Sequence, residues 1–239
     1  MLKEKINLYL EKHGLGHFCP KAVLFDMDGV LYDSMPHHAI AWQESMARFG
    51  ITMTAQDAYA TEGARGIDTI RHFVKLQKGE DISLADAQTM YDVKTHIFHT
   101  MPEAPIFDGV LDVMELLAHH DITINVVTGS GQRPLIDRLL RDFGRFLSKE
   151  HIVTAYDVDR GKPYPDPYLM GLRKAGDLLP WEAMVVENAP LGVQSGASAD
   201  IFTIGVNSGP LPDQVLYDAG AHIVYQKMTE LRVALNDLF

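Results

Sequence analysis

The chain alternates between stretches with helical spacing of apolar residues and short, unbroken apolar runs. Helical spacing predicts an amphipathic helix at residues 2–13, ended by Gly14. Residues 22–25 are an unbroken apolar run that leads into Asp26, which is typical of a strand buried on both faces. From about residue 36 to residue 99 almost every pattern is helical and none indicates a strand. The helices expected there are residues 39–49, 67–77 and 84–99, the last of them capped by Ser83.

Strand and helix patterns alternate beyond a proline-containing break at residues 101–105. The expected strands are residues 122–128, 152–155, 184–187, 201–206 and 222–225. The expected helices are residues 134–143, 167–175, 191–199 and 228–239. This alternation predicts βαβ units and a parallel sheet. The helical block is then an insertion after the first strand, above the edge of the sheet where ligands bind.

The sequence therefore predicts an α/β fold with a Rossmann-like parallel-sheet core and an inserted all-helical cap domain. We expect an N-terminal helical extension at residues 1–20. Residues 21–34 and 103–239 form the expected core, and residues 35–102 form the expected cap.

Composition and charge narrow the class of protein. No apolar run approaches the roughly 20 residues that span a bilayer, and the first residues lack the features of a signal peptide. The net charge of −11, without a basic stripe, argues against a nucleic-acid partner. The single cysteine, Cys19, cannot form an intrachain disulfide, which suits a reducing compartment. We expect a cytoplasmic protein without a membrane or nucleic-acid partner, as a monomer or weak dimer.

Polar residues suited to phosphoryl chemistry follow several of the expected strands. In chain order they are Asp26 and Asp28, then Thr128, Gly129 and Ser130, then Lys162, and finally Glu187 and Asn188. Parallel strands bring their carboxyl ends to one edge, so we expect these residues to converge. One carboxylate could attack phosphorus and a second could transfer protons. Carboxylates also bind Mg²⁺, and a lysine supplies positive charge that an acidic chain otherwise lacks.

Each of these signals also has a simpler interpretation. Asp26 or Asp28 alone could cap a turn, and residues 128–130 could be an ordinary strand-to-helix turn. Lys162 could be a solvated surface lysine, and it does not belong to a P-loop, because Pro163 stands where Ser or Thr is needed. Four signals in this order on alternating strands favour phosphoryl chemistry over coincidence.

With these motifs the chain resembles the haloacid dehalogenase superfamily of phosphotransferases over about residues 21–226. Within it, the chain is similar to the β-phosphoglucomutase-like subgroup with a helical cap. The resemblance implies that Asp26 is the nucleophile, Asp28 the general acid/base, and Lys162 a bridge between nucleophile and phosphate. It further implies that Thr128 binds the phosphoryl group, and that Glu187 and Asn188 join Asp26 and Asp28 at Mg²⁺. Gly129 and Ser130, in the same loop as Thr128, are further candidates for binding the phosphoryl group. His38 and Trp42 also match positions in the mutases, which makes His38 a candidate for substrate binding.

Three positions depart from the mutase pattern. Asn188 stands where a second acid is usual, so the metal site loses one negative charge. The cap reads Glu62-Gly63-Ala64-Arg65-Gly66 where the mutases carry Lys-Gly-x-x-Arg, and Gly131 replaces a lysine. We hypothesise that Glu62 returns the missing carboxylate to the metal, which would suit a compact substrate. The alternative is that Glu62 lies at a solvated edge of the cap while Arg65 binds the substrate.

The sequence thus predicts a Mg²⁺-dependent phosphohydrolase that acts through an aspartyl phosphate. Its expected partner is a small phosphorylated metabolite or pyrophosphate. One alternative is β-phosphoglucomutase, which converts β-glucose 1-phosphate into glucose 6-phosphate. The other alternative is a phosphate-ligand sensor without catalysis, against which the intact Asp26, Asp28 and Lys162 argue.

Overall fold

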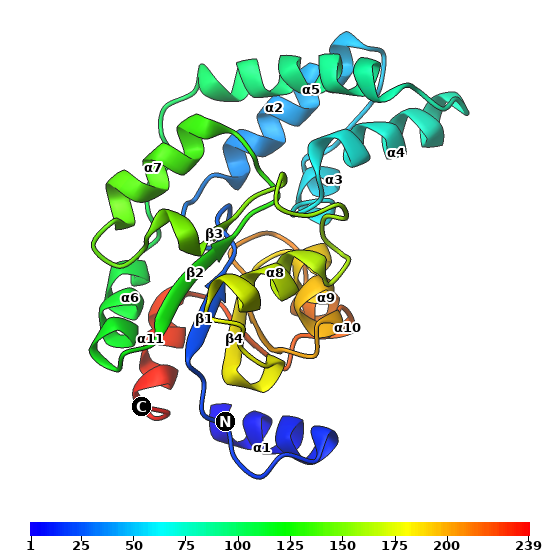
Figure 1. The fold of residues 1–239 in the computed structure, drawn as a ribbon. Coiled ribbons are helices and arrows are strands. Elements are labelled where there is room, and N and C mark those ends of the chain that lie inside the picture. Colours follow the sequence, from blue (N-terminus) through cyan, green and yellow to red (C-terminus); the bar gives the residue numbers. More distant parts are fainter.

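A six-stranded parallel sheet forms the centre of the computed structural model, which describes residues 1–239 (Figure 1). The strand order is β3–β2–β1–β4–β5–β6, and every pairing is parallel, which confirms the predicted α/β fold. The strands are β1 (Ala22–Phe25), β2 (Thr123–Val127), β3 (Ile152–Val153), β4 (Ala183–Glu187), β5 (Phe202–Val206) and β6 (Ile223–Tyr225). Phe25 is in register with Val126 and Val186, so β1, β2 and β4 end at the same edge.

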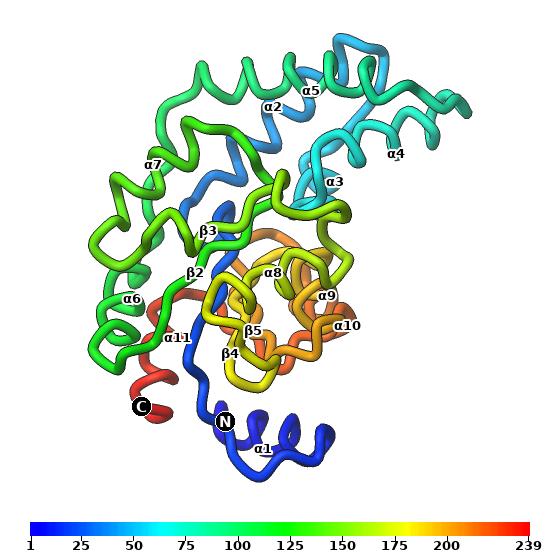
Figure 2. Tube along the Cα trace, viewed as in Figure 1, coloured from blue at the N-terminus to red at the C-terminus, as the bar shows by residue number.

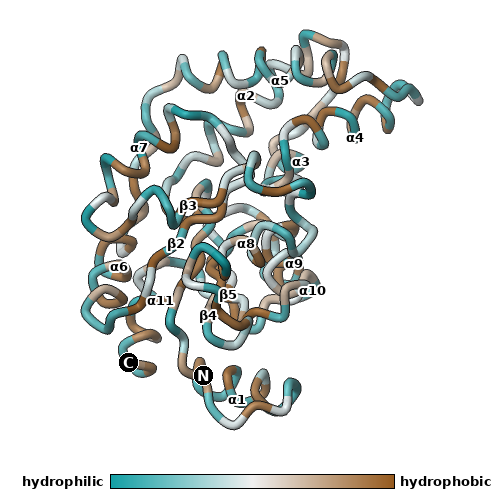
Figure 3. The backbone as a smooth tube through the Cα atoms, in the orientation of Figure 1, coloured by the Kyte–Doolittle hydropathy of each residue, from teal (hydrophilic) through white to brown (hydrophobic).

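Helices cover both faces of the sheet (Figure 1). On one face lie α6 (Val110–His119), α7 (Arg133–Phe143) and α11 (Met228–Asn236), and on the other lie α8 (Asp166–Lys174), α9 (Pro190–Ser198) and α10 (Asp213–Asp218). Val23 and Phe25 belong to the apolar cluster of the first face, whereas Leu24 belongs to that of the second. Burial on both faces explains the apolar character of the strands, and the labelled strands β2 to β5 are largely brown in Figure 3.

Four helices are inserted between β1 and α6, as the trace in Figure 2 shows. They are α2 (Met35–Arg48), α3 (Ala55–Ala60), α4 (Gly66–Lys78) and α5 (Leu84–His99). They enclose an apolar cluster of their own with 11 buried residues, among them Trp42, Met46 and Ile70. They lie over the carboxyl ends of the strands, so residues from both sides line the space between them.

The N-terminal helix α1 (Leu2–His13) ends at Gly14, which has the left-handed conformation with φ 66°. The Tyr9 hydroxyl donates to the carbonyl of Asp200 at 2.7 Å, and the Tyr9 ring packs edge-on against Phe202 and His222. The helix therefore covers the amino ends of the strands, far from the opposite edge of the sheet.

The element boundaries differ from the sequence expectations in several places. The helices α3, α6 and α10 were not predicted; α3 and α10 have only six residues each, too few for a clear periodicity. The helix α6 does bury apolar residues at helical spacing, so the sequence pattern was sufficient to predict this helix. The strand β3 is shorter than residues 152–155, and two 3₁₀ turns, η1 (Lys149–His151) and η2 (Pro180–Glu182), precede β3 and β4. None of the helices combines the length and the apolar character that crossing a membrane requires.

Candidate active site

The residue that follows β1, Asp26, forms a buried ion pair with Lys162. The Lys162 ammonium donates to Asp26 Oδ1 at 2.5 Å, to Glu187 Oε1 at 2.6 Å and to the carbonyl of Val127 at 3.0 Å. Although burial opposes it, the two carboxylates raise the pKa of Lys162, so this lysine stays charged. Lys162, from the loop after β3, thus brings together residues from the ends of β1, β2 and β4.

Glu187 occupies a different place from the one expected of a metal ligand. Its Oε1 accepts from Lys162 and from the Tyr168 hydroxyl at 2.8 Å. Its Oε2 accepts from the backbone N–H groups of Asn188 at 3.0 Å and Ala189 at 3.2 Å. Both oxygens are therefore occupied, and Glu187 does not line the cavity described below. The geometry supports Glu187 as a residue that positions Lys162, not as a metal ligand.

Asp28 is held by residues at the start of the inserted helices. The Ser34 hydroxyl donates to Asp28 Oδ1 at 2.6 Å, and His38 Nε2 lies 3.1 Å from the same oxygen. Burial would raise the pKa of Asp28, but His38 and Ser34 outweigh it and hold the pKa below its usual value. The expected site residue His38 is therefore brought to Asp28.

Lys94 on α5 is a functional candidate that the sequence reasoning missed. Its ammonium lies 2.7 Å from His38 Nδ1 and close to the rings of Trp42 and Phe98, 5.1 Å from each centroid. Burial lowers its pKa to about 8, against the opposing pull of Asp28 and Glu62. A signal did exist, because Lys94 continues the buried stripe of Ala87, Met90 and Ile97 on α5. A lysine on an apolar stripe indicates either a buried partner or a function.

The loop after β2 forms the floor of a cavity of about 60 Å³ between the sheet and α2–α5. Thr128, Gly129 and Ser130 all line it, together with Asp26 and Asp28. The Thr128 hydroxyl accepts from the backbone N–H of Ser130 at 3.0 Å, which shapes the loop. A Cβ atom on Gly129 would lie only 2.7 Å from the carbonyl oxygen of Gly63, so glycine allows the loop of the inserted helices to approach.

Glu62 also lines this cavity and contacts Asn188. Its Oε2 accepts from Asn188 Nδ2 at 3.0 Å, while Glu62 Oε1 and Asn188 Oδ1 are buried without a protein partner. Burial, then the charges of Asp26 and Asp28, raise the pKa of Glu62 well above its usual value. The alternative that placed Glu62 at a solvated edge is therefore wrong.

Arg65 does not reach the cavity, contrary to the expectation that it binds substrate there. Its Nε donates to Asp68 Oδ2 at 2.7 Å, and its guanidinium donates to the carbonyl of Asp159, also at 2.7 Å. It lines a separate surface cleft. Arg65 lies one residue before Gly66, which is the position of the mutase arginine. Because Arg65 precedes the first turn of α4, its side chain points outward.

The oxygen atoms around the cavity fit a hard divalent cation. Glu62 lines the cavity together with Asp26 and Asp28, and its Oε1 is buried without a protein partner. Asn188 does not line the cavity, but it is bonded to Glu62 and its Oδ1 is also buried without a partner. Clustered carboxylates repel one another, and Mg²⁺ prefers such oxygen ligands. His, Cys, Asp and Glu side chains alone form no group of three or more with metal-ligand spacing. A set of oxygen ligands here therefore has to include the amide oxygen of Asn188.

Tyr91 on α5 closes the cavity at the point where the mutase pattern has an arginine. A Cβ atom on Gly66 would overlap the Tyr91 ring, so the glycine and the ring occupy adjoining space. The Tyr91 hydroxyl accepts from Gln132 Nε2 at 3.3 Å, in the loop after Ser130. Gly131 in the same loop is likewise covered by the ring of Tyr156. Aromatic rings thus take up space next to the loop that follows β2.

Comparisons with known proteins point in one direction. A family model described as haloacid dehalogenase-like hydrolase matches residues 23–206. Hexitol phosphatase A of Escherichia coli strain K12 is 35% identical over 189 residues, 79% of this chain and 83% of that protein. Beta-phosphoglucomutase of Bacillus subtilis strain 168 is 26% identical over 225 residues, 90% of this chain and 93% of that protein. A solved Bacteroides vulgatus structure with a provisional beta-phosphoglucomutase assignment has a TM-score of 0.93 and 44% identity, and covers 98% of this chain and 95% of its own.

Proposed function

The chain belongs to the haloacid dehalogenase-like hydrolase family, and we propose that it is a Mg²⁺-dependent phosphohydrolase with pyrophosphate as its leading candidate substrate. Its relatives are phosphatases and a phosphomutase of small phosphorylated metabolites, so it is an enzyme of this general type. The observation that carries the finer proposal is the small cavity roofed by Glu62 and Tyr91.

The reaction follows from how the two aspartates are held. Lys162 occupies Asp26 Oδ1, which leaves the other carboxylate oxygen to attack phosphorus and form an aspartyl phosphate. The phosphoryl group of the substrate brings negative charge beside Asp28 and opposes the effect of His38, so Asp28 takes up a proton when substrate binds. Asp28, oriented by Ser34 and His38, donates this proton to the leaving oxygen and later takes one from the attacking water. Thr128 and the backbone amides of its loop bind the phosphoryl oxygens.

Asp26, Asp28, Asn188 and Glu62 would hold Mg²⁺ with oxygen atoms only. When bound, Mg²⁺ would offset the negative charge that the phosphoryl group brings next to these carboxylates. Glu62 belongs to the inserted helices and Asn188 follows β4, so the ligand set would draw on both sides of the cavity.

The size of the cavity favours a compact substrate. A volume of about 60 Å³ corresponds to a few water-sized atoms, since one water needs roughly 10–15 Å³ on this measure. Pyrophosphate or a very small phosphate ester matches that size better than a sugar carrying two phosphates. A mutase must also hold a second phosphate, but here Tyr91 adjoins Gly66 and Arg65 points away. These contacts support hydrolysis over the mutase alternative.

A phosphate-release screen with Mg²⁺ tests the reaction and the substrate together. The panel holds pyrophosphate, hexitol phosphates, other sugar phosphates and β-glucose 1-phosphate, with Asp26→Asn as the inactive control. We expect pyrophosphate to give the highest kcat/KM and the control to give none. Formation of glucose 6-phosphate without phosphate release would instead establish the mutase. If no substrate gave activity above that of the control, the result would favour the alternative of a phosphate-ligand sensor without catalysis.

A charge exchange between Glu62 and Asn188 tests the metal site. We expect Glu62→Gln to raise the Mg²⁺ concentration for half-maximal binding about tenfold, because one carboxylate is lost. Adding Asn188→Asp to that variant should restore most of the affinity. The exposed acid Glu80 provides a matched control as Glu80→Gln. Calorimetric Mg²⁺ titration measures the affinity without turnover, and an unchanged affinity and turnover in Glu62→Gln would overturn this assignment.

A further inference from the structure

The two chain segments that join the sheet to the inserted helices lie against each other. Residues 29–34 are here termed the first linker, and residues 101–107 the second linker. The backbone N–H of Asp33 donates to the carbonyl of Pro105 at 2.9 Å, and that of Phe107 donates to the carbonyl of Leu31 at 3.0 Å. The linkers therefore form a short paired ribbon. Any movement of α2–α5 relative to the sheet must bend or separate these two segments.

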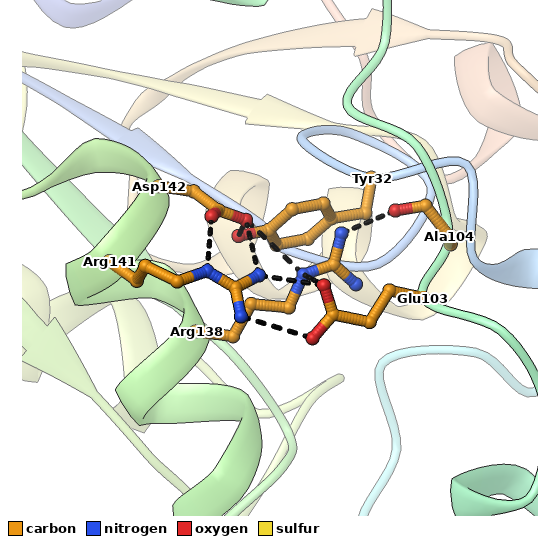
Figure 4. A network of polar contacts seen from close by, with 6 residues as sticks. All are labelled: Tyr32, Glu103, Ala104, Arg138, Arg141 and Asp142. Atoms are coloured by element: carbon orange, nitrogen blue, oxygen red, sulfur yellow. Dashed lines mark hydrogen bonds and ion pairs between the residues drawn. The ribbon is translucent and has the colours of Figure 1, made fainter.

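One turn of α7 contacts both linkers (Figure 4). The Tyr32 hydroxyl of the first linker donates to Asp142 Oδ2 at 3.0 Å, and the Arg138 guanidinium lies 3.9 Å from the centre of the Tyr32 ring. Arg138 also donates to Asp142 Oδ2 at 3.2 Å and to the carbonyl of Ala104 in the second linker. Arg138 thus contacts one linker through an aromatic ring and the other through a backbone carbonyl.

A second, outer contact involves the same turn of α7. Arg141 donates to both oxygens of Glu103, at 3.1 and 2.7 Å, and to Asp142 Oδ1 at 2.8 Å. The side chains of Arg138 and Asp142 are 12% and 15% exposed, whereas those of Arg141 and Glu103 are 55% and 62% exposed. Salt therefore screens the outer contact far more than the inner one.

The first linker also contacts a residue of the candidate active site. The backbone N–H of Gly29 donates to the carbonyl of Tyr32 at 2.8 Å, and Ser34 at the end of the first linker binds Asp28. The helix α7 begins directly after the loop that contains Thr128, so one helix adjoins the phosphate loop and both linkers. Asp28, the proposed proton donor, is therefore bonded to the first linker, and the first linker is in turn bonded to α7.

We propose that Tyr32, Arg138 and Asp142, with the outer pair Glu103–Arg141, form a clamp that positions the inserted helices over the active site. The clamp keeps the two linkers paired, so the helices return to one closed position over Asp26 and Asp28. Its residues touch no reacting atom and act by setting the fraction of molecules in that closed arrangement. When this fraction falls, the apparent affinity for substrate falls in proportion, while turnover of the closed complex is retained.

The variant Arg138→Met removes the inner contact and keeps much of the side-chain volume. Hydrogen exchange of the linker amides Asp33 and Phe107 should become about tenfold faster, because their bonds open whenever the linkers separate. The KM of the best substrate found in the screen should rise about five- to tenfold, with kcat within about twofold. Arg141→Met should give a smaller effect that disappears at high salt.

The ion pair Arg145–Glu115 supplies the control, since its 2.7 Å contact and the packing of Arg145 on Phe146 lie near α7 but touch neither linker. Arg145→Met should leave exchange at Asp33 and Phe107 and the KM unchanged. Should Arg138→Met fail to fold, Tyr32→Phe, which removes only the bond to Asp142, must show the same direction of change.

Two results would overturn the clamp. Linker amides that exchange as in the wild type would exclude it, and so would a lower kcat and lower stability at unchanged KM. Exchange requires no substrate, so it decides the clamp even if the phosphohydrolase proposal fails.

Discussion

Replacing Lys94 by methionine removes a buried charge from the cap side of the active site. The lysine is only 2% exposed and is the only lysine or arginine that lines the cavity. Methionine has a similar length and no charge, so it keeps most of the packing against Trp42 and Phe98. The substitution therefore separates what the charge does for stability from what it does for catalysis.

The size of the stability effect follows from the pKa. Burial lowers the pKa of Lys94 to about 8 from the usual 10.5, which corresponds to a cost of about 3 kcal/mol for the charged form. Methionine removes this cost but loses the contact with His38 and the cation–π contacts, together about 1–2 kcal/mol. We therefore expect Lys94→Met to raise the free energy of unfolding by about 1–2 kcal/mol at pH 7.

The sign of the pH dependence provides a sharper check. Between pH 8 and 10.5 the unfolded chain holds the Lys94 proton more tightly than the folded one, so the wild type gains stability as pH rises. That gain reaches about 2 kcal/mol at pH 9.5, and Lys94→Met lacks it. Urea unfolding followed by circular dichroism at pH 7 and 9.5 measures the difference between the two proteins.

The same variant should lose at least about tenfold in kcat/KM, because the cavity loses its lysine beside incoming phosphate. A variant that is less stable than the wild type by the same amount at both pH values would refute the reasoning. It would mean that Lys94 contributes favourable contacts larger than its cost of burial.

Three further substitutions test other parts of the structure. Burial lowers the pKa of His222 to about 4, so the free energy of unfolding of the wild type should fall by up to about 3 kcal/mol between pH 6.5 and pH 4. Urea unfolding should show a smaller fall for His222→Asn, and equal falls would contradict this. Both polar side-chain atoms of Asn125 on β2 are buried without a partner, so Asn125→Val should raise the free energy of unfolding by about 1–2 kcal/mol, and a decrease would show that the amide is stabilising. Tyr168→Phe removes a donor to Glu187, and steady-state kinetics should show a several-fold lower kcat at nearly constant KM; a change confined to KM would place Tyr168 in substrate binding instead.

The sequence was most informative where chemistry depends on the end of a strand. Asp26 directly follows an apolar run, and Thr128 and Asn188 follow two others, so a parallel sheet brings them to one edge. The alternation of strands and helices was sufficient for that inference, because parallel strands joined by crossover helices share a direction. The fold class and the family therefore followed from local pattern and motif order.

The direction and partners of each side chain could not be predicted in this way. Glu187 was expected at the metal, but its oxygens accept from Lys162 and Tyr168, which lie in other segments, and from the two backbone amides that follow it. Arg65 was expected at the substrate, but the start of α4 turns it toward Asp68 and Asp159. These outcomes depend on contacts between residues that are far apart along the chain.

The sequence by itself determined which residues stand at the carboxyl edge of the sheet, because the two-residue period and parallel direction of strands are local properties. Only the tertiary structure decided how large the cavity is and what charge it contains. Tyr91 and Lys94 enter it from α5, across a gap that packing between the inserted helices and the sheet defines. Packing is a property of the assembled chain, so the size of the cavity was decided there.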